Sequence, residues 1–257
     1  MQIRWLTIFL DFPGPVFGAE VAFWREVTGS GLSPFRGPEG EVATLLPAHG
    51  DAYLRVQRVR EGNGGCHLDL HVDTGSVDEA PAHAVTLGAR IRHRDAELVI
   101  LDSPGGFTFC VVPWDAEKTV PGPVTLDHGG SSRLDQLCLD IPPESYEREC
   151  SFWGALSGWE VRQGSRPEFA YLERPSGMPA RLLLQRRKSV GTGDLVSGHV
   201  DFSCEDPGRL ARRHVIAGAK ILGTFPYWLM MANPSGREYC LTMRDPETGK
   251  LRAPGSA

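Results

Sequence analysis

The sequence lacks three features: an excess of basic residues, a long apolar run and a Cys-x-x-Cys pair. It has 27 lysines and arginines against 32 aspartates and glutamates, a formal net charge of -5 at pH 7. A nucleic-acid partner requires concentrated positive charge, so this balance argues against one. No apolar run has the length of a bilayer-spanning helix, so we expect no membrane partner.

The start of the chain and the cysteines indicate the compartment. Residues 1–18 are apolar, but Arg4 and Asp11 interrupt them and no small-residue cleavage site follows, so they do not resemble a signal peptide. The six cysteines lie mostly within apolar segments, as reduced core cysteines do. Disulfides are rare in the cytosol, and we therefore expect a cytoplasmic protein without them.

The chain is longer than most single domains. Its 257 residues, of which 41% are hydrophobic, suffice for two hydrophobic cores of ordinary size. The 30 glycines and 20 prolines indicate many turns. We therefore expect a globular protein of two domains.

The sequence repeats itself at a nearly constant distance. The segment IRWLTIFLDFP (residues 3–13) aligns with SRLDQLCLDIP (residues 132–142) at an offset of 129, and an adjacent Phe-Trp pair recurs at the same offset. Three pairs follow at offsets of 130 to 132: His67 with His199, Asp69 with Asp201, and Cys110 with Cys240. Small changes of offset are what loop insertions produce, so the chain contains two homologous halves.

We place the two halves at residues 1–115 and 131–245. Residues 116–130, between them, are rich in proline and glycine and are predicted to be a linker. Residues 246–257 are predicted to be a frayed tail.

Each half contains the same order of elements twice. In the first half the predicted elements are a strand at 4–11, a helix with Phe17, Val21 and Trp24 on one face, strands at 42–46 and 53–59, a strand at 67–72, a helix at 79–89 and a closing hairpin. The second half keeps this order. Strand, helix and several strands, repeated four times, is the predicted organisation.

This organisation resembles the vicinal oxygen chelate superfamily, and within it the glyoxalase-like domains of the glyoxalase, bleomycin resistance protein and dioxygenase group. The segments that carry the resemblance are LRVQRV, HLDLHVD, LGA and DSPGGFTFCVV in the first half, and LLLQR, HVDFSCED, AGA and NPSGREYCLTM in the second. The resemblance implies an α+β fold of four βαβββ modules, in which two cup-shaped, helix-backed mixed sheets each enclose a ligand cavity.

The His-x-Asp segments place polar side chains on one face of a strand. Successive side chains of a strand point to opposite faces, so His67, Asp69 and His71 share one face and apolar residues share the other. His199 and Asp201 repeat this division. We expect the polar faces to line the two ligand cavities.

The superfamily's metal-holding members use two histidines and two glutamates, or substitutes for them, on the first and last strands of two modules. The resemblance places these positions at Arg4, Gln57, His67 and Cys110 in the first half, and at Arg133, Gln185, His199 and Cys240 in the second. Arginine has no lone pair to donate, and amides or thiols stand where acidic ligands are expected. The chain therefore departs from the metal-binding pattern of the superfamily.

Two interpretations of the His-x-Asp strands stay open. A rearranged divalent-metal site of His67, Asp69 and His71 has the donor types that such a cation accepts. Alternatively, each histidine and aspartate form a hydrogen-bonded structural pair, and the arginines of the first strands replace the cation as partners of the aspartates. We favour the second interpretation and assign no cofactor, with a divalent metal as the alternative.

Two further kinds of residue are candidates for chemistry. Glu238, beside a hairpin turn, has the character of a general base, although an exposed glutamate after a turn is the commoner outcome. Cys110 and Cys240 are candidate nucleophiles, but the sequence shows no activating neighbour, and small core residues are the better interpretation. No residue is therefore assigned a catalytic role.

Two classes of function remain. The first is a metal-independent protein that binds a small apolar or aromatic molecule, as the resistance-type members that sequester drugs do. The alternative is a metal-dependent enzyme, either a glyoxalase-like lyase or isomerase or, less readily, an extradiol dioxygenase. The dioxygenase requires two histidines and a glutamate in the second half, where Arg133 and Cys240 occupy two of these positions. The sequence leaves open the identity of the ligand and the formation of a homodimer.

Overall fold

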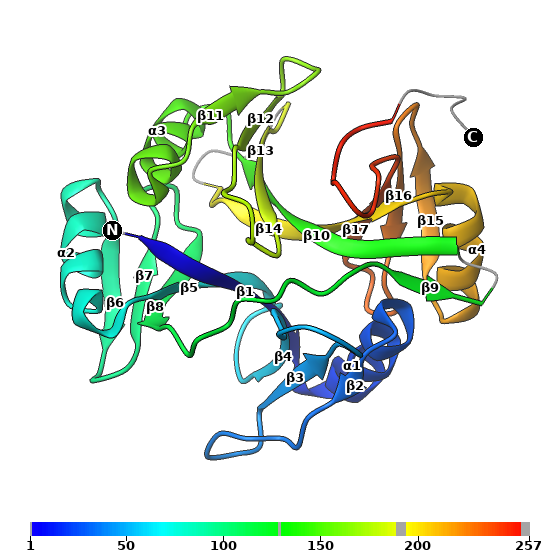
Figure 1. Ribbon diagram of the computed structural model, residues 1–257, viewed down its shortest axis with the longest axis horizontal. Helices are drawn as coiled ribbons and strands as arrows, with labels where there is room; N and C mark the ends of the chain where they lie inside the picture. The colour runs from blue at the N-terminus through cyan, green and yellow to red at the C-terminus, as the bar shows by residue number, and fades with distance from the viewer. Residues whose placement is uncertain (1, 128–129, 189–193, 253–257) are drawn as a thin grey trace. The chain divides into compact units, whose positions relative to one another are not determined.

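The computed structural model describes residues 2–127, 130–188 and 194–252. Strand, helix and three strands follow one another four times along the chain (Figure 1). This order confirms the predicted α+β class and its four βαβββ modules. None of the described helices combines the length and apolarity needed to cross a bilayer.

Modules 1 and 2 contribute the strands of one mixed sheet. In hydrogen-bonded order these are β2 (Gly31–Leu32), β3 (Val42–Leu46), β4 (Leu54–Val59), β1 (Ile3–Pro13), β5 (Gly65–Val72), β8 (Thr108–Pro113), β7 (Val99–Asp102) and β6 (Arg90–Arg94). The pair β5 and β8 is parallel, and β6, β7 and β8 pair antiparallel. The short strands β2 and β6 were not located individually by the sequence analysis.

Modules 3 and 4 repeat this arrangement. Their order is β11 (Val161–Gln163), β12 (Phe169–Leu172), β13 (Arg181–Arg186), β10 (Gly130–Ile141), β14 (Ser197–Cys204), β17 (Glu238–Thr242), β16 (Trp228–Ala232) and β15 (Lys220–Thr224). An additional strand, β9 (Val124–Leu126), pairs with the start of β10 and lies inside the predicted linker. Residues 128–129 of that linker are outside the described residues.

The helices α1 (Gly14–Thr28) and α3 (Tyr146–Ser157) follow the first strand of each half. Their apolar faces are buried, and each helix ends at a glycine. Gly29 and Gly158 have φ angles of 61° and 72°, a left-handed conformation that glycine adopts without a steric penalty. The second modules contain the shorter helices α2 (Glu79–Thr86) and α4 (Pro207–Ile216).

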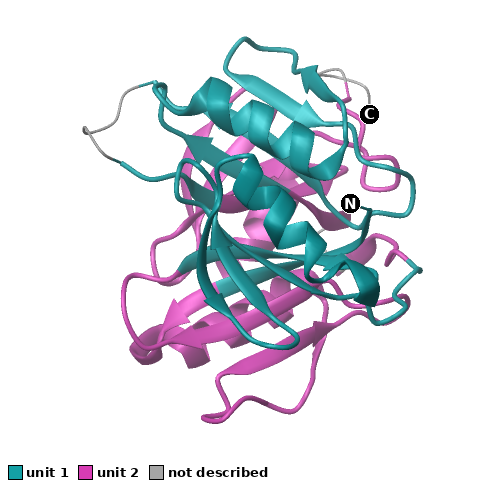
Figure 2. Ribbon diagram, turned by 90° about the vertical axis from the view of Figure 1, so that its left-hand side faces the viewer, with its two compact units in different colours: residues 1–10, 65–119, 137–198 teal, residues 11–64, 120–136, 199–257 magenta. Residues whose placement is uncertain are grey.

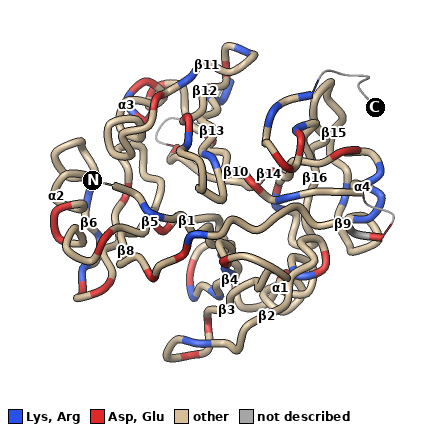
Figure 3. Tube along the Cα trace, in the orientation of Figure 1, with Lys and Arg blue, Asp and Glu red and all other residues tan. Residues whose placement is uncertain are grey.

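The chain forms two compact units, and each unit takes one module from each half (Figure 2). Unit 1 consists of Met1–Leu10, Gly65–Thr119 and Leu137–Gly198, and unit 2 of Asp11–Gly64, Val120–Gln136 and His199–Ala257. Lysine and arginine segments lie among aspartate and glutamate segments along the trace (Figure 3). The predicted domain limits at 115 and 131 describe the sequence repeat and stay a prediction.

A buried glutamate joins the two modules inside each unit. In unit 1, Glu149 on α3 accepts hydrogen bonds from the backbone N–H of Gly105 and from the indole of Trp153. In unit 2, Glu20 on α1 accepts from Ser235 and Asn233 of a hairpin turn and from the indole of Trp24; Figure 1 labels both helices. Both glutamates are fully buried, and burial raises the pKa of each. Because they align at the offset of 129, the repeat has preserved one packing device twice.

The chain beyond Asp245 is ordered as far as it is described, so the predicted fraying is wrong for residues 246–252. The amide of Asp245 donates to Lys250 O at 2.8 Å, and the amide of Arg252 donates to Met243 O at 2.9 Å. The guanidinium of Arg252 also donates to the backbone oxygens of Cys204 and Glu205. Residues 253–257 of the predicted tail are outside the described residues.

We expect Arg252→Ala to lower the free energy of unfolding by about 1 kcal/mol, because two backbone acceptors lose a charged donor near the surface. Urea unfolding of the full chain measures this change. Lys250→Ala is the matched control, since Lys250 is exposed in the same segment. Equal stability of the two variants would contradict a stabilising role for the tail.

Candidate functional site

Strand register brings a cysteine beside each His-x-Asp segment. In unit 1, Asp69 on β5 lies opposite Cys110 on the parallel strand β8. In unit 2, Asp201 on β14 lies opposite Cys240 on β17, which is the equivalent pair. Each half of the chain therefore assembles a set of one histidine, one aspartate and one cysteine from two neighbouring strands.

The first of these sets contains His67, Asp69 and Cys110. Their potential donor atoms all lie within 4.8 Å of one another, and His67 Nε2 is 3.9 Å from Asp69 Oδ1. The ring of Phe9 stacks on the His67 ring with 4.2 Å between centroids and 20° between planes. The imidazole is therefore held in place by a ring on one face and polar groups at its edge.

The second set contains His199, Asp201 and Cys240. His199 Nε2 lies 3.4 Å from Asp201 Oδ1 and 3.9 Å from Cys240 Sγ, so the carboxylate and the thiol converge on one ring nitrogen. Gln136 on β10 donates its amide N–H to the other oxygen of Asp201. This bond fixes the orientation of the carboxylate toward His199.

The sequence analysis missed two residues of the first strands, Thr7 and Gln136. They align at the offset of 129, and each touches the polar strand of its own half: Thr7 Oγ1 lies 2.9 Å from His71 Nε2, and Gln136 bonds to Asp201. The alternation of side chains along the first strand could have identified them. Residues 4 and 7 are separated by an odd number of positions, so Thr7 lies on the opposite face of the strand from Arg4, the residue that the sequence analysis considered.

Arg4 and Arg133 have other partners than the aspartates predicted for them. Arg4 Nε lies 3.1 Å from Asp73 Oδ1, and its guanidinium lies over the Trp114 ring at 4.6 Å. Arg133 lies 3.9 Å from Asp135 and donates to Glu247 O. The predicted ion pairs with Asp69 and Asp201 are therefore wrong.

His71 lies outside the first set, although it shares the strand face of His67. Its Nε2 contacts Thr7, and its Nδ1 lies 3.5 Å from Glu117 Oε1 in the segment that follows β8. The structure therefore groups Cys110, rather than His71, with His67 and Asp69. At the corresponding place in the second half, the Ser203 hydroxyl donates to Arg133 O.

The remaining predicted residues have simpler surroundings. Gln57 lies on β4 opposite Val42, and Gln185 on β13 accepts a hydrogen bond from the Cys138 thiol at 3.4 Å. Glu238 is exposed at the start of β17, the outcome that the sequence analysis preferred. All six cysteines are among the described residues, and none of them forms a disulfide.

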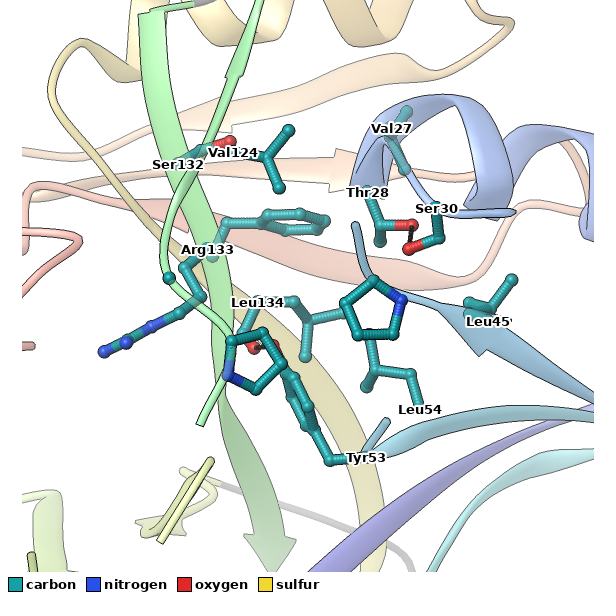
Figure 4. Close-up of a pocket in the computed structure, with 14 residues that line it drawn as sticks. Val27, Thr28, Ser30, Leu45, Tyr53, Leu54, Val124, Ser132, Arg133 and Leu134 are labelled. Carbon is teal, nitrogen blue, oxygen red and sulfur yellow. Dashed lines mark hydrogen bonds between the residues drawn. The ribbon is translucent and has the colours of Figure 1, made fainter. Parts of the chain in front are cut away.

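A small pocket in unit 2 does not coincide with these sets (Figure 4). It lies near the end of α1, with Tyr53, Leu134 and Phe202 among its lining residues, and it encloses about 30 Å³. That volume holds one or two water molecules and is too small for an organic ligand. The guanidinium of Arg133, one of the predicted residues, points away from it (Figure 4).

The first set fits a metal ion in the type and spacing of its donors. Imidazole, carboxylate and thiolate are ligands of zinc and of related divalent ions, and the three groups converge within 4.8 Å. Three donors from two strands leave room for water or a substrate oxygen. His67, Asp69 and Cys110 are therefore the described residues of unit 1 best placed to hold a divalent cation.

Comparison with known proteins gives a family and a fold. The model of the family described as "Glyoxalase-like domain" matches residues 7–112 and 136–242. No curated protein matches the chain. The structure is similar to that of the Mn(II)-bound glyoxalase from Novosphingobium aromaticivorans, with a TM-score of 0.65 and 19% identity over 98% of this chain and 86% of that one.

Two dioxygenases have similar folds. For 2,2',3-trihydroxybiphenyl 1,2-dioxygenase from Sphingomonas wittichii strain RW1, the TM-score is 0.63 at 14% identity, over 92% of this chain and 88% of that one. For the 2,3-dioxygenase LapB from Pseudomonas sp. KL28, the TM-score is 0.62 at 13% identity, over 98% of this chain and 94% of that one. Identities this low establish the common fold and leave the chemistry to the residues of the site.

Proposed function

The chain belongs to the family of glyoxalase-like domains, and from this premise we propose that it binds a small apolar or aromatic molecule, without needing a divalent metal, against the polar faces of β5 and β14. The observation that carries this proposal is the repetition of one His, Asp and Cys set at the same register in both halves. A packing role alone would not require three polar side chains at both places. Such convergent polar groups orient a ligand whose remaining surface is apolar.

The other positions support independence from metal. On the first strands, Thr7 contacts His71, which lies outside the first set, and Gln136 uses its amide N–H to bond to Asp201, so neither adds a metal donor to its set. Arg4 and Arg133 are cations with acidic partners of their own. Each set therefore has three donors, one of them a thiol that must lose its proton before it binds a metal.

A metal-dependent enzyme is the second candidate, because the donors of His67, Asp69 and Cys110 converge. These three residues would hold the cation, which would polarise a substrate oxygen as a Lewis acid. Such an enzyme would be a lyase or isomerase. Phe9 orients the His67 ring in either case.

Metal analysis and ligand titration of the full chain test the proposal. Protein purified without chelators should contain substoichiometric metal by plasma mass spectrometry. With 2-naphthol as the probe at tenfold excess over its dissociation constant, linkage stabilises the protein by about 1.4 kcal/mol. That corresponds to a rise in Tm of about 3 to 6 °C for a protein of this size. EDTA should leave the rise unchanged.

Three variants, one of them a control, complete the test. His67→Ala and His199→Ala should each weaken the response to 2-naphthol, whereas Glu238→Ala, at an exposed position, should not. Stoichiometric metal that is lost in His67→Ala would overturn the metal-independent proposal in favour of the second candidate. No stabilisation by 2-naphthol or by catechol would count against aromatic ligands.

A further inference from the structure

Cys240 has surroundings that differ from those of the buried cysteines Cys150 and Cys204. Its Sγ lies 3.9 Å from His199 Nε2, and the carboxylate of Asp201 lies 3.4 Å from the same nitrogen. An imidazole in contact with a thiol can accept the thiol proton, and a neighbouring carboxylate stabilises the resulting imidazolium. The sequence shows no such neighbour because His199 and Cys240 are 41 residues apart.

Cys150 is the internal reference for this comparison. Its residue is 8% exposed and that of Cys240 is 9% exposed, so a reagent meets the two thiols at similar depth. Cys150, however, is beside Tyr146, and burial raises its pKa to about 11. Burial likewise raises the pKa of Cys204 to about 12. Both are expected to remain protonated and unreactive at neutral pH.

The corresponding thiol of the first half is less accessible. Cys110 is 4% exposed, and the His67 imidazole near it is covered on one face by Phe9. The position equivalent to Phe9 is occupied in the second half by Cys138, a smaller residue. The two halves therefore hold the same three groups with different access to the thiol.

We propose that Cys240 is a nucleophilic thiol, activated by His199 and Asp201, that captures small molecules bearing a carbon–carbon double bond conjugated to a carbonyl group. This rests on the proposed function and narrows its ligand class. His199 and Asp201, both from β14, have donor atoms within 4.8 Å of the Cys240 sulfur, and Cys138 and Asp140 of β10 have donor atoms within the same distance of those of His199. On the other side, the register partner of Cys240 on β16 is Met230, which is uncharged.

The capture step needs no other reactant. The Cys240 proton moves to His199 Nε2, and the thiolate sulfur forms a bond to the β-carbon of the acceptor. The π electrons of the double bond move onto the α-carbon and carbonyl oxygen as an enolate, and His199 Nε2 returns the proton to the α-carbon. The S–H bond and the π bond are thus replaced by an S–C and a C–H bond, with no leaving group or oxidant. Asp201, held by Gln136, stabilises the intermediate imidazolium.

N-ethylmaleimide, which contains this conjugated system, tests the inference on the full native chain. Brief labelling at pH 7, followed by peptide mass spectrometry, gives a separate rate for each cysteine. Cys240 should react at least about tenfold faster than Cys150, because thiolate content sets the rate. His199→Asn should slow Cys240 by about tenfold. His93→Asn, at an exposed histidine outside both sets, should leave the Cys240 rate unchanged.

The pH dependence of the Cys240 labelling rate tests the inference in the wild-type chain, and therefore also where a variant does not fold. In the wild-type chain the Cys240 rate should level off near neutral pH, whereas an unassisted thiol keeps gaining rate up to pH 9. Equal rates at Cys240 and Cys150, or a Cys240 rate that rises steadily to pH 9, would overturn the inference. Stabilisation by 2-naphthol in Cys240→Ser would then show that the proposed function stands while this inference fails.

Discussion

Between pH 7 and pH 5, the double variant His214→Ala/Tyr239→Phe should lose about 2 kcal/mol less stability than the wild-type chain does. His214 on α4 is fully buried, and its Nδ1 lies 2.9 Å from the Tyr239 hydroxyl on β17. Burial, assisted by the nearby charge of Arg213, lowers the pKa of His214 to about 3. The first half has Ala84 and Phe109 at the equivalent positions, so the double variant copies a packing that the fold already uses.

The sign follows from the two pKa values. Above pH 6.5 the imidazole is neutral in the folded and in the unfolded chain and does not make stability depend on pH. Between pH 6.5 and about 3, only the unfolded chain binds the proton, so stability falls as the pH falls. The raised pKa values of Glu20 and Glu149 act in the opposite direction. Their contribution to the stability of the fold is greatest below pH 4.5, the pKa of a glutamate in the unfolded chain. It declines as the pH rises through the pKa of each glutamate in the folded chain.

Urea unfolding of the wild type and of the double variant at pH 7 and pH 5 measures the effect as a difference between these two proteins. The carboxyl groups are common to both, so the comparison isolates the histidine. Tyr239→Phe alone is the control, because it retains His214 and should retain the acid sensitivity. If the double variant lost as much stability as the wild type between these pH values, His214 would not be the buried neutral group described.

The second large effect concerns the buried glutamates. Glu149→Ala should lower the free energy of unfolding by about 3 to 5 kcal/mol, because it leaves the Gly105 amide and the Trp153 indole without their acceptor and opens a cavity. Glu20→Ala should cost at least as much, since Glu20 accepts from three donors. Chemical unfolding followed by tryptophan fluorescence suits both variants, since each glutamate bonds to an indole.

Two further variants give this prediction its controls. Glu149→Gln keeps one acceptor oxygen and turns the other into a donor, so about half of the loss is expected. Glu144→Ala, just before α3 and exposed, should change stability by less than about 0.5 kcal/mol. A Glu149→Ala protein as stable as Glu144→Ala would mean that the glutamate does not hold the two modules of unit 1 together.

Much of the fold was predictable because its signals are local or repeated. Alternation and helical periodicity located β3, β5, α1 and α3. The short edge strands β2 and β11 were not located, because two or three residues carry too little periodicity. The buried role of Glu20 and Glu149 was also missed, since a glutamate on a helix is ordinarily exposed.

For the candidate site, the sequence by itself determined the duplication, the four modules and the strand faces that carry His67, Asp69, His199 and Asp201. These follow from the spacing of residues along one strand, which the covalent chain imposes. Only the tertiary structure decided that Cys110 and Cys240 join these residues, that Thr7 touches His71 and Gln136 touches Asp201, and that Arg4 and Arg133 do not pair with the aspartates. The reason is that such contacts depend on the register between strands far apart in the chain, and no local pattern in a single sequence encodes that register.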